Sequence, residues 1–295
     1  MKVSVVIRTY NEQKYLSELL KGIVEQDLNG HELEIVLVDS GSTDRTLEIA
    51  GKFGARIVHI KKSDFTFGRS LNVGCDAAVG DALVFVSGHC IPTDSHWIAN
   101  LVAPLDRGEA SFSYGKQVGW GSSKFSECQL FRKYYPEVSR IQDKDFFCNN
   151  ANSALLKRVW KLFPFDEELT GLEDMDLGLR LVNHGHKIAY VAEAPVYHIH
   201  EENWATLKNR YAREAIALQK IMPQVHVGFG DFLRYFFSAI FYDFGAAVQE
   251  KRLAATFREI VLFRFFQFLG TYKGNHEHRR LSHEMKEQYF YPKGK

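Results

Sequence analysis

The sequence is poor in cysteine, proline and long apolar runs. Its 295 residues include four cysteines and seven prolines, and no two cysteines form a Cys-x-x-Cys pair. This spacing fits no zinc ribbon and indicates reduced, buried thiols in a cytosolic protein. No apolar run approaches the roughly 20 residues that span a bilayer, and the apolar stretch before Arg8 is too short for a signal peptide. We therefore expect a cytoplasmic location.

An excess of either charge is also absent. Lys and Arg number 37 and Asp and Glu number 36, which gives a formal net charge of +1. A nucleic-acid partner is therefore not expected, because nothing in the overall charge attracts one. The chain is 45% hydrophobic and 25% charged, as globular proteins are, and it is long enough to bury a substantial core.

Strand and helix patterns alternate over the first hundred residues. Apolar, often β-branched runs predict buried strands at residues 3–7, 34–38, 56–60 and 83–86. Helical patterns lie between these runs, and Asn11 is expected to cap the first helix. Such alternation predicts an α/β fold, with a mainly parallel sheet flanked by helices on both faces.

Polar residues gather where the predicted strands end. Residues 8–12, 39–44 and 87–92 leave the carboxyl ends of strands, and ligands of such sheets bind at that edge. Asp39 is placed to accept hydrogen bonds from a pyrimidine or a ribose. A helix cap is the simpler interpretation of Ser42, but capping needs only one acceptor and leaves Asp39 to be explained.

Three carboxylates crowd into four positions in the segment GLEDMDLGLRL, which begins at Gly171. On a helix, Glu173 and Asp176 share a face while Asp174 points elsewhere. Crowded carboxylates raise one another's pKa, which favours a general base. The structural alternative is a solvated helix N-terminus, where acidic residues suit the helix dipole.

Four cationic or imidazole side chains have both a functional and a structural interpretation. Arg69 faces a phosphate or forms a surface ion pair. His89 follows a buried strand, and it either ligates a metal through its neutral imidazole or is an ordinary loop histidine. His198 and His200 alternate, so on one strand they share a face and form a metal or phosphate site, or serve the structure.

The order of these motifs makes residues 2–200 resemble the inverting family 2 glycosyltransferases of the GT-A fold, in particular the rhamnosyltransferase-like members of bacterial polysaccharide synthesis. The series is TYNE, VDSGSTDRT, N-x-G with A-x-GD, a strand-end loop, ED-x-D-L-x-x-R and a late histidine. The resemblance implies transfer of a sugar, with inversion, from a pyrimidine-nucleotide sugar to a glycan or lipid-linked acceptor.

The resemblance also assigns residues to roles. It implies that Thr9, Tyr10, Glu12 and Asp39 line the base and ribose. Arg69 and Ser87 are also expected in the nucleotide-sugar site. Asp39 would contact the pyrimidine imide. Asp174 matches the family's catalytic base, which deprotonates the acceptor hydroxyl. Asn152 and Glu173 are expected to contact the acceptor or the donor sugar.

One motif departs from the family pattern. An Asp-x-Asp that helps bind a divalent cation is expected after the fourth strand, and the chain has Ser87-Gly88-His89 there. We expect His89 and His198 to bind the cation, Mn²⁺ or Mg²⁺, with imidazole favouring Mn²⁺. The alternatives are weak binding assisted by the diphosphate, or a protonated His89 that replaces the cation.

The remainder of the chain is predicted to be a helical extension. We expect a nucleotide-sugar-binding half at residues 1–105, an acceptor-binding and catalytic half at 106–203, and the extension at 204–295. Residues 231–245 are rich in aromatic side chains, and residues 251–295 carry a cationic excess. Such helices bind an anionic membrane surface, peripherally at the inner face of the cell membrane, or pack as a subdomain or homodimer.

Two rival functions stay open from the sequence. A nucleotidyltransferase has a similar sheet, but it would carry a glycine-rich, basic loop after the first strand where this chain has TYNE. A catalytically impaired nucleotide-sugar-binding protein would explain the missing Asp-x-Asp, although the retained Asp174 argues against it.

Overall fold

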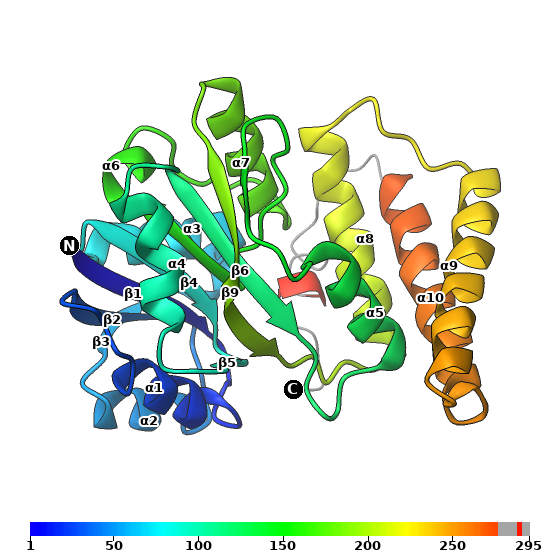
Figure 1. Ribbon diagram of the computed structural model, residues 1–295, viewed down its shortest axis with the longest axis horizontal. Coiled ribbons are helices and arrows are strands. Elements are labelled where there is room, and N and C mark those ends of the chain that lie inside the picture. The colour runs from blue at the N-terminus through cyan, green and yellow to red at the C-terminus, as the bar shows by residue number, and fades with distance from the viewer. Residues whose placement is uncertain (277–287, 291–295) are drawn as a thin grey trace. The chain divides into compact units, whose positions relative to one another are not determined.

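The computed structural model describes residues 1–276 and 288–290 (Figure 1). These residues form two compact units. Unit 1 contains Met1–Trp120, Tyr134–Glu168 and Glu173–Ile199. Unit 2 contains Gly121–Lys133, Leu169–Leu172 and the described residues from His200 onward. The three-part division drawn from the sequence stays a prediction about function, because units defined by packing do not test it.

Unit 1 is built on a nine-stranded sheet in the order β3-β2-β1-β4-β8-β6-β9-β5, with β7 pairing with β9. Strands β1 to β4 are parallel, whereas β8 runs antiparallel to both β4 and β6. The mainly parallel α/β sheet expected from the sequence is therefore confirmed. The strands are β1 Lys2–Thr9, β2 Glu32–Asp39, β3 Arg56–His59, β4 Ala82–Ser87, β5 Cys90–Pro92, β6 Phe112–Val118, β7 Arg140–Gln142, β8 Asn152–Leu156 and β9 Ile188–His198.

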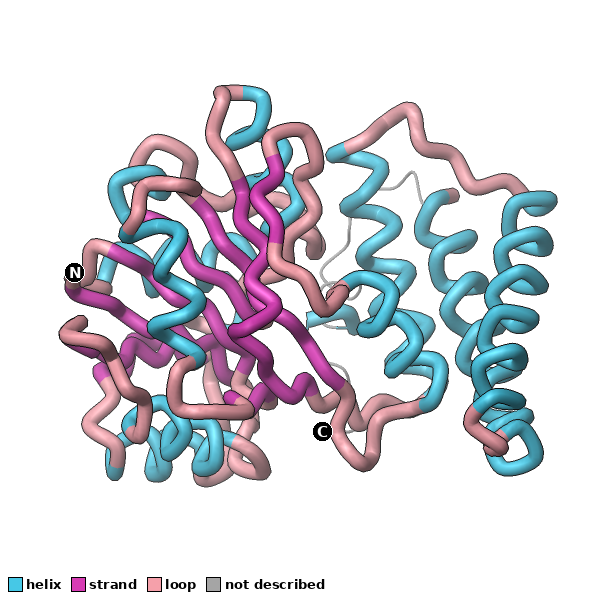
Figure 2. Tube along the Cα trace, viewed as in Figure 1, coloured by secondary structure: helices cyan, strands magenta, loops and turns pink. Residues whose placement is uncertain are grey.

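Helices cover both faces of this sheet, with α3 behind it and α4 in front in the views of Figures 1 and 2. The close fit of α3 depends on Gly74, where a Cβ atom would lie 2.4 Å from a Cγ atom of Val6. The helices of unit 1 are α1 Leu16–Val24, α2 Thr46–Lys52, α3 Phe67–Ala77, α4 Trp97–Asp106, α6 Lys157–Trp160 and α7 Glu173–Asn183, with a 3₁₀ turn at Lys62–Asp64.

The expected cap at Asn11 is wrong. Helix α1 begins later, at Leu16, with Tyr15 preceding it. Asn11 has a φ of 56°, a left-handed conformation that asparagine tolerates better than most residues. Its Oδ1 accepts a hydrogen bond from the backbone N–H of Thr43 at 2.8 Å. Asn11 therefore joins the loop after β1 to the loop after β2.

Residues 106–160 are more regular than the sequence indicates. They contain β6, β7 and β8, as well as helix α5 (Phe125–Tyr134). Strand β7 has only three residues and β8 is buried throughout, and neither kind of run gives an alternating pattern that sequence can detect. Further along the chain, Ile188–His198 forms a single strand, β9.

Unit 2 is helical. Besides most of α5 it contains α8 Trp204–Ile221, α9 Phe229–Gln249 and α10 Leu253–Asn275, which confirms the helical extension expected from residue 204. Gly270 and Gly274 let α10 approach α8 closely, because a Cβ at either would clash with a backbone carbonyl of α8. No helix in the described part of the chain is long and apolar enough to cross a membrane. Part of the predicted basic tail, residues 277–287 and 291–295, lies outside the described residues.

Candidate active site

The strand ends meet at one edge of the sheet, as the sequence predicts. In the parallel pairing of β1 with β2, Thr9 lies opposite Asp39. In the pairing of β1 with β4, Arg8 lies opposite Ser87. The loops after these three strands therefore leave the sheet together, and the polar segments that follow them share one edge.

Asp174 is a buried carboxylate in the first turn of α7, with 7% of its surface exposed. Its Oδ2 accepts from the backbone N–H of Asn150 at 2.8 Å, and its Oδ1 from that of Met175 at 2.8 Å. Burial, followed by the negative charge of Glu173, raises the pKa of Asp174 to about 7. Such a carboxylate exchanges its proton near neutral pH, as a general base requires.

Glu173 and Arg8 form a pair beside this carboxylate. Arg8 Nη1 lies 3.1 Å from Glu173 Oε1 and also donates to the carbonyl of Phe67 at 3.3 Å. Arg8 thus links the end of β1 to the start of α7, and its charge opposes the rise in the pKa of Asp174. Asp176, three residues after Glu173 and on the same side of the helix, pairs with Arg180 at 2.8 Å.

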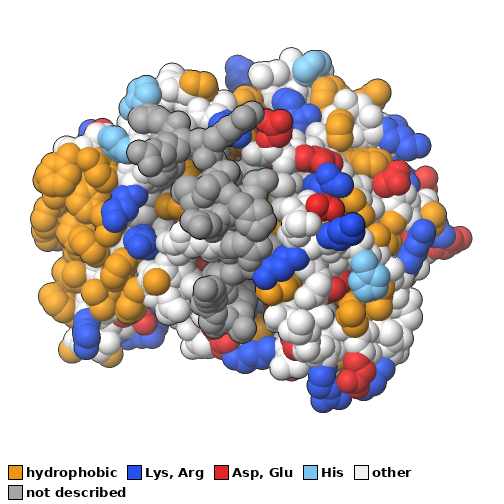
Figure 3. Space-filling view, turned by 180° about the vertical axis from the view of Figure 1, so that it is seen from behind, with side chains coloured by type: hydrophobic (Ala, Val, Ile, Leu, Met, Phe, Trp, Pro, Cys, Tyr) orange, Lys and Arg blue, Asp and Glu red, His pale blue; other side chains and the backbone are white. Residues whose placement is uncertain are grey.

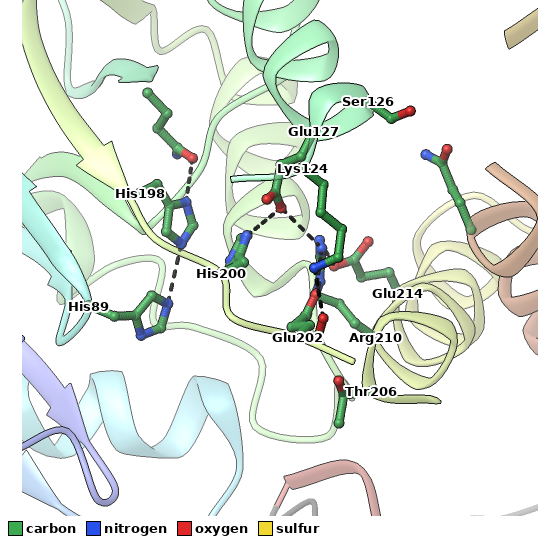
Figure 4. Close-up of polar contacts among 12 residues, drawn as sticks. His89, Lys124, Ser126, Glu127, His198, His200, Glu202, Thr206, Arg210 and Glu214 are labelled. Atoms are coloured by element: carbon green, nitrogen blue, oxygen red, sulfur yellow. Dashed lines mark hydrogen bonds and ion pairs between the residues drawn. The ribbon is translucent and has the colours of Figure 1, made fainter. Parts of the chain in front are cut away.

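His89 and His198 face one another. Their Nε2 atoms are 3.3 Å apart and their rings stack at 5.3 Å between centroids (Figure 4). His198 is buried at the end of β9, and its Nδ1 lies 2.7 Å from Gln117 Oε1. His89 follows β4, and its Nδ1 lies 3.3 Å from Glu12 Oε1. Each imidazole therefore has an oxygen partner on the nitrogen that faces away from the other ring.

A chain of hydrogen bonds fixes which nitrogen of His198 carries its proton. The backbone N–H of Ala151 donates to Asn149 Oδ1, which also accepts from Gln117 Nε2 at 2.9 Å. Gln117 therefore presents its oxygen to His198, so Nδ1 of His198 is the donor. The carboxylate of Glu12 accepts a hydrogen bond in the same way, so Nδ1 of His89 is also the donor. When both rings are neutral, two Nε2 lone pairs point at one another.

Facing lone pairs repel one another unless a cation lies between them. A shared proton serves this purpose, and so does a divalent metal ion, since outer hydrogen bonds of this kind commonly orient metal-ligating histidines. Ligand nitrogens about 2.1 Å from one ion stand roughly 3.0–3.4 Å apart at ordinary bond angles, and the observed separation is 3.3 Å. The donor set therefore fits a borderline ion such as Mn²⁺, Co²⁺ or Zn²⁺ better than Mg²⁺.

Comparison with known proteins identifies the family. The model of glycosyl transferase family 2 matches residues 4–163, which is more than half of the chain. The chain belongs to glycosyltransferase family 2. This match confirms the family resemblance that the sequence motifs of this family 2 glycosyltransferase indicate.

Two curated relatives are similar to this family 2 glycosyltransferase over most of its length. The poly(ribitol-phosphate) beta-N-acetylglucosaminyltransferase TarS of Staphylococcus aureus is 25% identical over 219 residues, covering 72% of this chain and 38% of that protein. The O-antigen chain rhamnosyltransferase RfbN of Salmonella typhimurium is 27% identical over 213 residues, covering 68% and 67%. The chain therefore spans well under half of the staphylococcal relative.

Solved structures confirm the GT-A-type fold. A mannosyltransferase from Pyrobaculum calidifontis, solved with GDP-Man and Mn²⁺, has a TM-score of 0.61 at 16% identity and covers 99% of this chain and 88% of its own. Residues 1–349 of S. aureus TarS, solved with UDP, have a TM-score of 0.57 at 19% identity and cover 95% and 93%. At these identities the likeness concerns the fold alone.

The residues expected to bind the nucleotide in this family 2 glycosyltransferase differ in burial and in hydrogen-bond partners. Asp39 is buried, and its carboxylate accepts from the backbone N–H groups of Gly41 and Ser42 and from the Ser42 hydroxyl. It therefore shapes the loop after β2, and its contact with a base stays a prediction. The Thr9 hydroxyl, also buried, lies 3.4 Å from Asp39 Oδ1.

Three other expected residues are more accessible. The Tyr10 hydroxyl accepts from Lys62 Nζ at 3.4 Å, and the ammonium also lies over its ring. Ser87 ends β4 and is half-buried. Arg69 is half exposed and lies 3.9 Å from Glu167, which is the surface ion pair considered as its structural alternative. A phosphate contact by Arg69 stays a prediction.

Two other expected residues have partners within the fold. Asn152 is fully buried, where its Oδ1 accepts from Trp97 Nε1 and its Nδ2 donates to the carbonyls of Lys116 and Ala194. A sugar contact by Asn152 stays a prediction. Glu12 places its carboxylate beside His89, and its contact with the base or ribose stays a prediction.

His200 belongs to unit 2, not to the face of β9 that carries His198. Its Nδ1 lies 2.7 Å from Glu127 Oε1, in a buried cluster with Arg210 and Glu202 (Figure 4). Burial opposes ionisation of Glu202, but the charge of Arg210 outweighs it and lowers the pKa of Glu202 to about 2. This cluster is a charge-compensated structural core.

The sequence missed three contributors to the site: Arg8, Gln117 and Asn150. Arg8 stands at the end of an otherwise apolar strand, and a cation in that position is the one signal that could have revealed it. Gln117 is an inconspicuous polar residue in β6, and Asn150 acts through its backbone. Neither gives a recognisable sequence signal.

Proposed function

We propose that this family 2 glycosyltransferase transfers a hexosyl or deoxyhexosyl group, with inversion, from a pyrimidine-nucleotide sugar to a glycan or lipid-linked acceptor in bacterial surface polysaccharide synthesis. The observation that carries the proposal is Asp174, a buried carboxylate held by two backbone N–H groups with its pKa raised to about 7. The names of the two curated relatives, a beta-N-acetylglucosaminyltransferase and an O-antigen rhamnosyltransferase, support the reaction class.

In this proposal Asp174 is the general base. It takes the proton of an acceptor hydroxyl as that oxygen attacks the anomeric carbon on the face opposite the nucleoside diphosphate. The bond from the anomeric carbon to the diphosphate oxygen breaks as the new glycosidic bond forms. A single displacement of this kind inverts the anomeric configuration. Glu173 lies beside the base and is proposed to contact the acceptor or donor sugar.

His89 and His198 are proposed to hold a divalent cation through their Nε2 atoms. A bound cation would neutralise charge on the leaving diphosphate. Glu12 and Gln117 orient the two rings from behind. Neighbours of the same fold, a mannosyltransferase with GDP-Man and Mn²⁺ and a glucosyl-3-phosphoglycerate synthase with Mn²⁺ and UDP, support divalent cation use.

The donor nucleotide is proposed to lie against the ends of β1, β2 and β4, with Thr9, Tyr10 and Asp39 at the base and ribose and Arg69 and Ser87 towards the diphosphate. UDP and UDP-GlcNAc complexes of TarS, which has the same fold, support a pyrimidine donor. We further propose that the protein acts at the inner face of the cell membrane, where a lipid-linked acceptor is available.

A donor screen tests this function. Thermal unfolding is followed with UDP-, dTDP-, GDP- and ADP-sugars in the presence of Mn²⁺, and a donor at 100 times its Kd should stabilise the fold by about 2.7 kcal/mol. Donors that bind are then incubated with lipid-linked and glycan acceptors, and released diphosphate and glycosylated product are measured. Stabilisation with product formation supports a transferase. Binding without sugar release indicates an impaired binding protein, and pyrophosphate release from a nucleoside triphosphate and a sugar phosphate indicates a nucleotidyltransferase.

A further inference from the structure

Helix α9 carries an apolar surface that the described residues leave exposed. Leu233, Phe237 and Phe241 follow one another at four-residue intervals and so form a stripe along the helix. Phe237 is 51% exposed and Phe241 is 69% exposed. Figure 3 shows hydrophobic side chains gathered over this part of the molecule, at the left of that view. The other large exposed apolar side chains of α9 and α10 are Phe229, Tyr235, Tyr242, Val248, Phe257 and Phe265. Together these nine side chains are called the α9–α10 apolar face.

Packing of unit 2 does not account for this face. Helix α9 already buries an adjoining side, and Ile240 and Ala247 there join a core with Phe125 and Ile260. Monomeric proteins rarely expose apolar patches this large unless the patch binds something. The exposure of these side chains makes the α9–α10 apolar face a candidate binding surface.

The charges of these helices indicate what the partner is. Each of their four acidic side chains is engaged within unit 2, by the backbone N–H of Gly228 (Asp231), by Arg264 (Asp243), by Arg132 (Glu250) and by the backbone N–H of Phe125 (Glu259). The cations are presented to solvent instead, at Arg234, Lys251, Arg258 and Lys273. The surface offered to a partner is thus apolar, aromatic and positively charged.

We infer that the α9–α10 apolar face lies on an anionic lipid surface, with α9 parallel to the bilayer plane. Phe237 and Phe241 enter the boundary of the acyl chains, and the exposed cations contact lipid phosphates. A second copy of this chain fits less well, since two such faces would bring like charges together. The inference makes the proposed membrane location specific. It requires neither donor nor metal, so it can fail while the proposed transferase function stands.

Vesicle flotation tests the inference with the full-length protein and no donor. Vesicles of phosphatidylcholine mixed with phosphatidylglycerol are compared with phosphatidylcholine alone. The double variant Phe237→Ser/Phe241→Ser removes the centre of the stripe, and Arg234→Gln/Arg258→Gln removes two cations. Val138→Ser/Leu162→Ser is the matched control, because these side chains are 74% and 73% exposed but lie in unit 1. Thermal unfolding of each variant confirms that the fold is intact.

We expect the wild-type and control proteins to float with the anionic vesicles and to be released by salt. The partition coefficient of the aromatic double variant should fall by about tenfold or more, given the transfer free energy of two phenylalanine side chains. The cation variant should lose its preference for vesicles that contain phosphatidylglycerol. Absence of flotation by the wild type, or equal flotation of the folded aromatic variant, overturns the inference. So does a wild-type dimer in light scattering that the aromatic variant converts to monomer, because a second copy then covers the face.

Discussion

The backbone N–H of Asn150 donates to Oδ2 of Asp174 at 2.8 Å, joining the loop before β8 to the first turn of α7. This bond holds the carboxylate at a fixed point while burial and Glu173 raise its pKa. The same bond opposes the rise in the pKa, because a hydrogen bond to the carboxylate favours its ionised form.

Arg8 and Glu173 should shift the pH dependence of transfer in opposite directions. The cation of Arg8 lowers the pKa of Asp174 and the charge of Glu173 raises it. Arg8→Gln should therefore move the acid limb of the kcat/KM profile to higher pH, and Glu173→Gln should move it to lower pH. Steady-state rates across pH 5 to 9, roughly two units either side of neutrality, measure both. Shifts in the same direction would show that these residues do not act through Asp174.

The stability of the protein should also report the pKa of Asp174. Its folded pKa is raised, so between about pH 4 and 7 the folded state holds a proton that the unfolded state has released. The carboxylate therefore lowers stability progressively as the pH rises through this window. The melting temperature of Asp174→Asn minus that of the wild type should increase from pH 4 to 7 and then level off. Each kcal/mol of difference in unfolding free energy should shift the melting temperature by about 2–4 °C. A difference independent of pH would contradict the raised pKa.

Much of this arrangement could be predicted from the sequence, because it follows from short stretches of consecutive residues. The strands β1 to β4 are apolar runs, and the polar residues that end them meet because parallel strands share an edge. Asp174 and His89 could be found for the same reason, since each stands in or after a recognisable motif.

Other parts of the site could not be predicted. The Gln117–His198 contact joins residues 81 positions apart, and a single sequence does not reveal such pairs. Glu12 was assigned to the nucleotide because the motif suggested it, but the fold brings His89 within 3.3 Å of its carboxylate. Asn152 was expected to contact a sugar, and its partners in α4, β6 and β9 become visible only in the fold.

His89 should set the metal preference. Imidazole is a good ligand for Mn²⁺ and a poor one for Mg²⁺, whereas a carboxylate suits both. In calorimetry without donor or acceptor, the wild-type protein should bind Mn²⁺ more tightly than Mg²⁺. The variant His89→Asp should reduce the difference in affinity between the two ions. His96→Ala, at an exposed histidine outside the site, should change nothing. Equal affinity of the wild type for the two ions, or full transferase activity in EDTA, would count against a metal at His89 and His198.

Asp39 should confer a preference for pyrimidine nucleotides. UDP or dTDP should bind at least about tenfold more tightly than GDP or ADP, a difference of about 1.4 kcal/mol. Asp39→Asn should reduce that preference. Its melting temperature serves as the control, because Asp39 also holds the loop after β2. Wild-type affinities that do not distinguish purine from pyrimidine diphosphates would refute the assignment.

The transfer rate of Asp174→Asn tests the central claim most directly. Asp176→Asn is the matched control, since that carboxylate lies in the same turn of α7 but pairs with Arg180. With donor and acceptor identified by the screen, Asp174→Asn should bind donor with unchanged Kd and transfer sugar about 10²–10⁴-fold more slowly, while Asp176→Asn keeps most of the wild-type rate. Turnover by folded Asp174→Asn within a few-fold of the wild type would contradict the account.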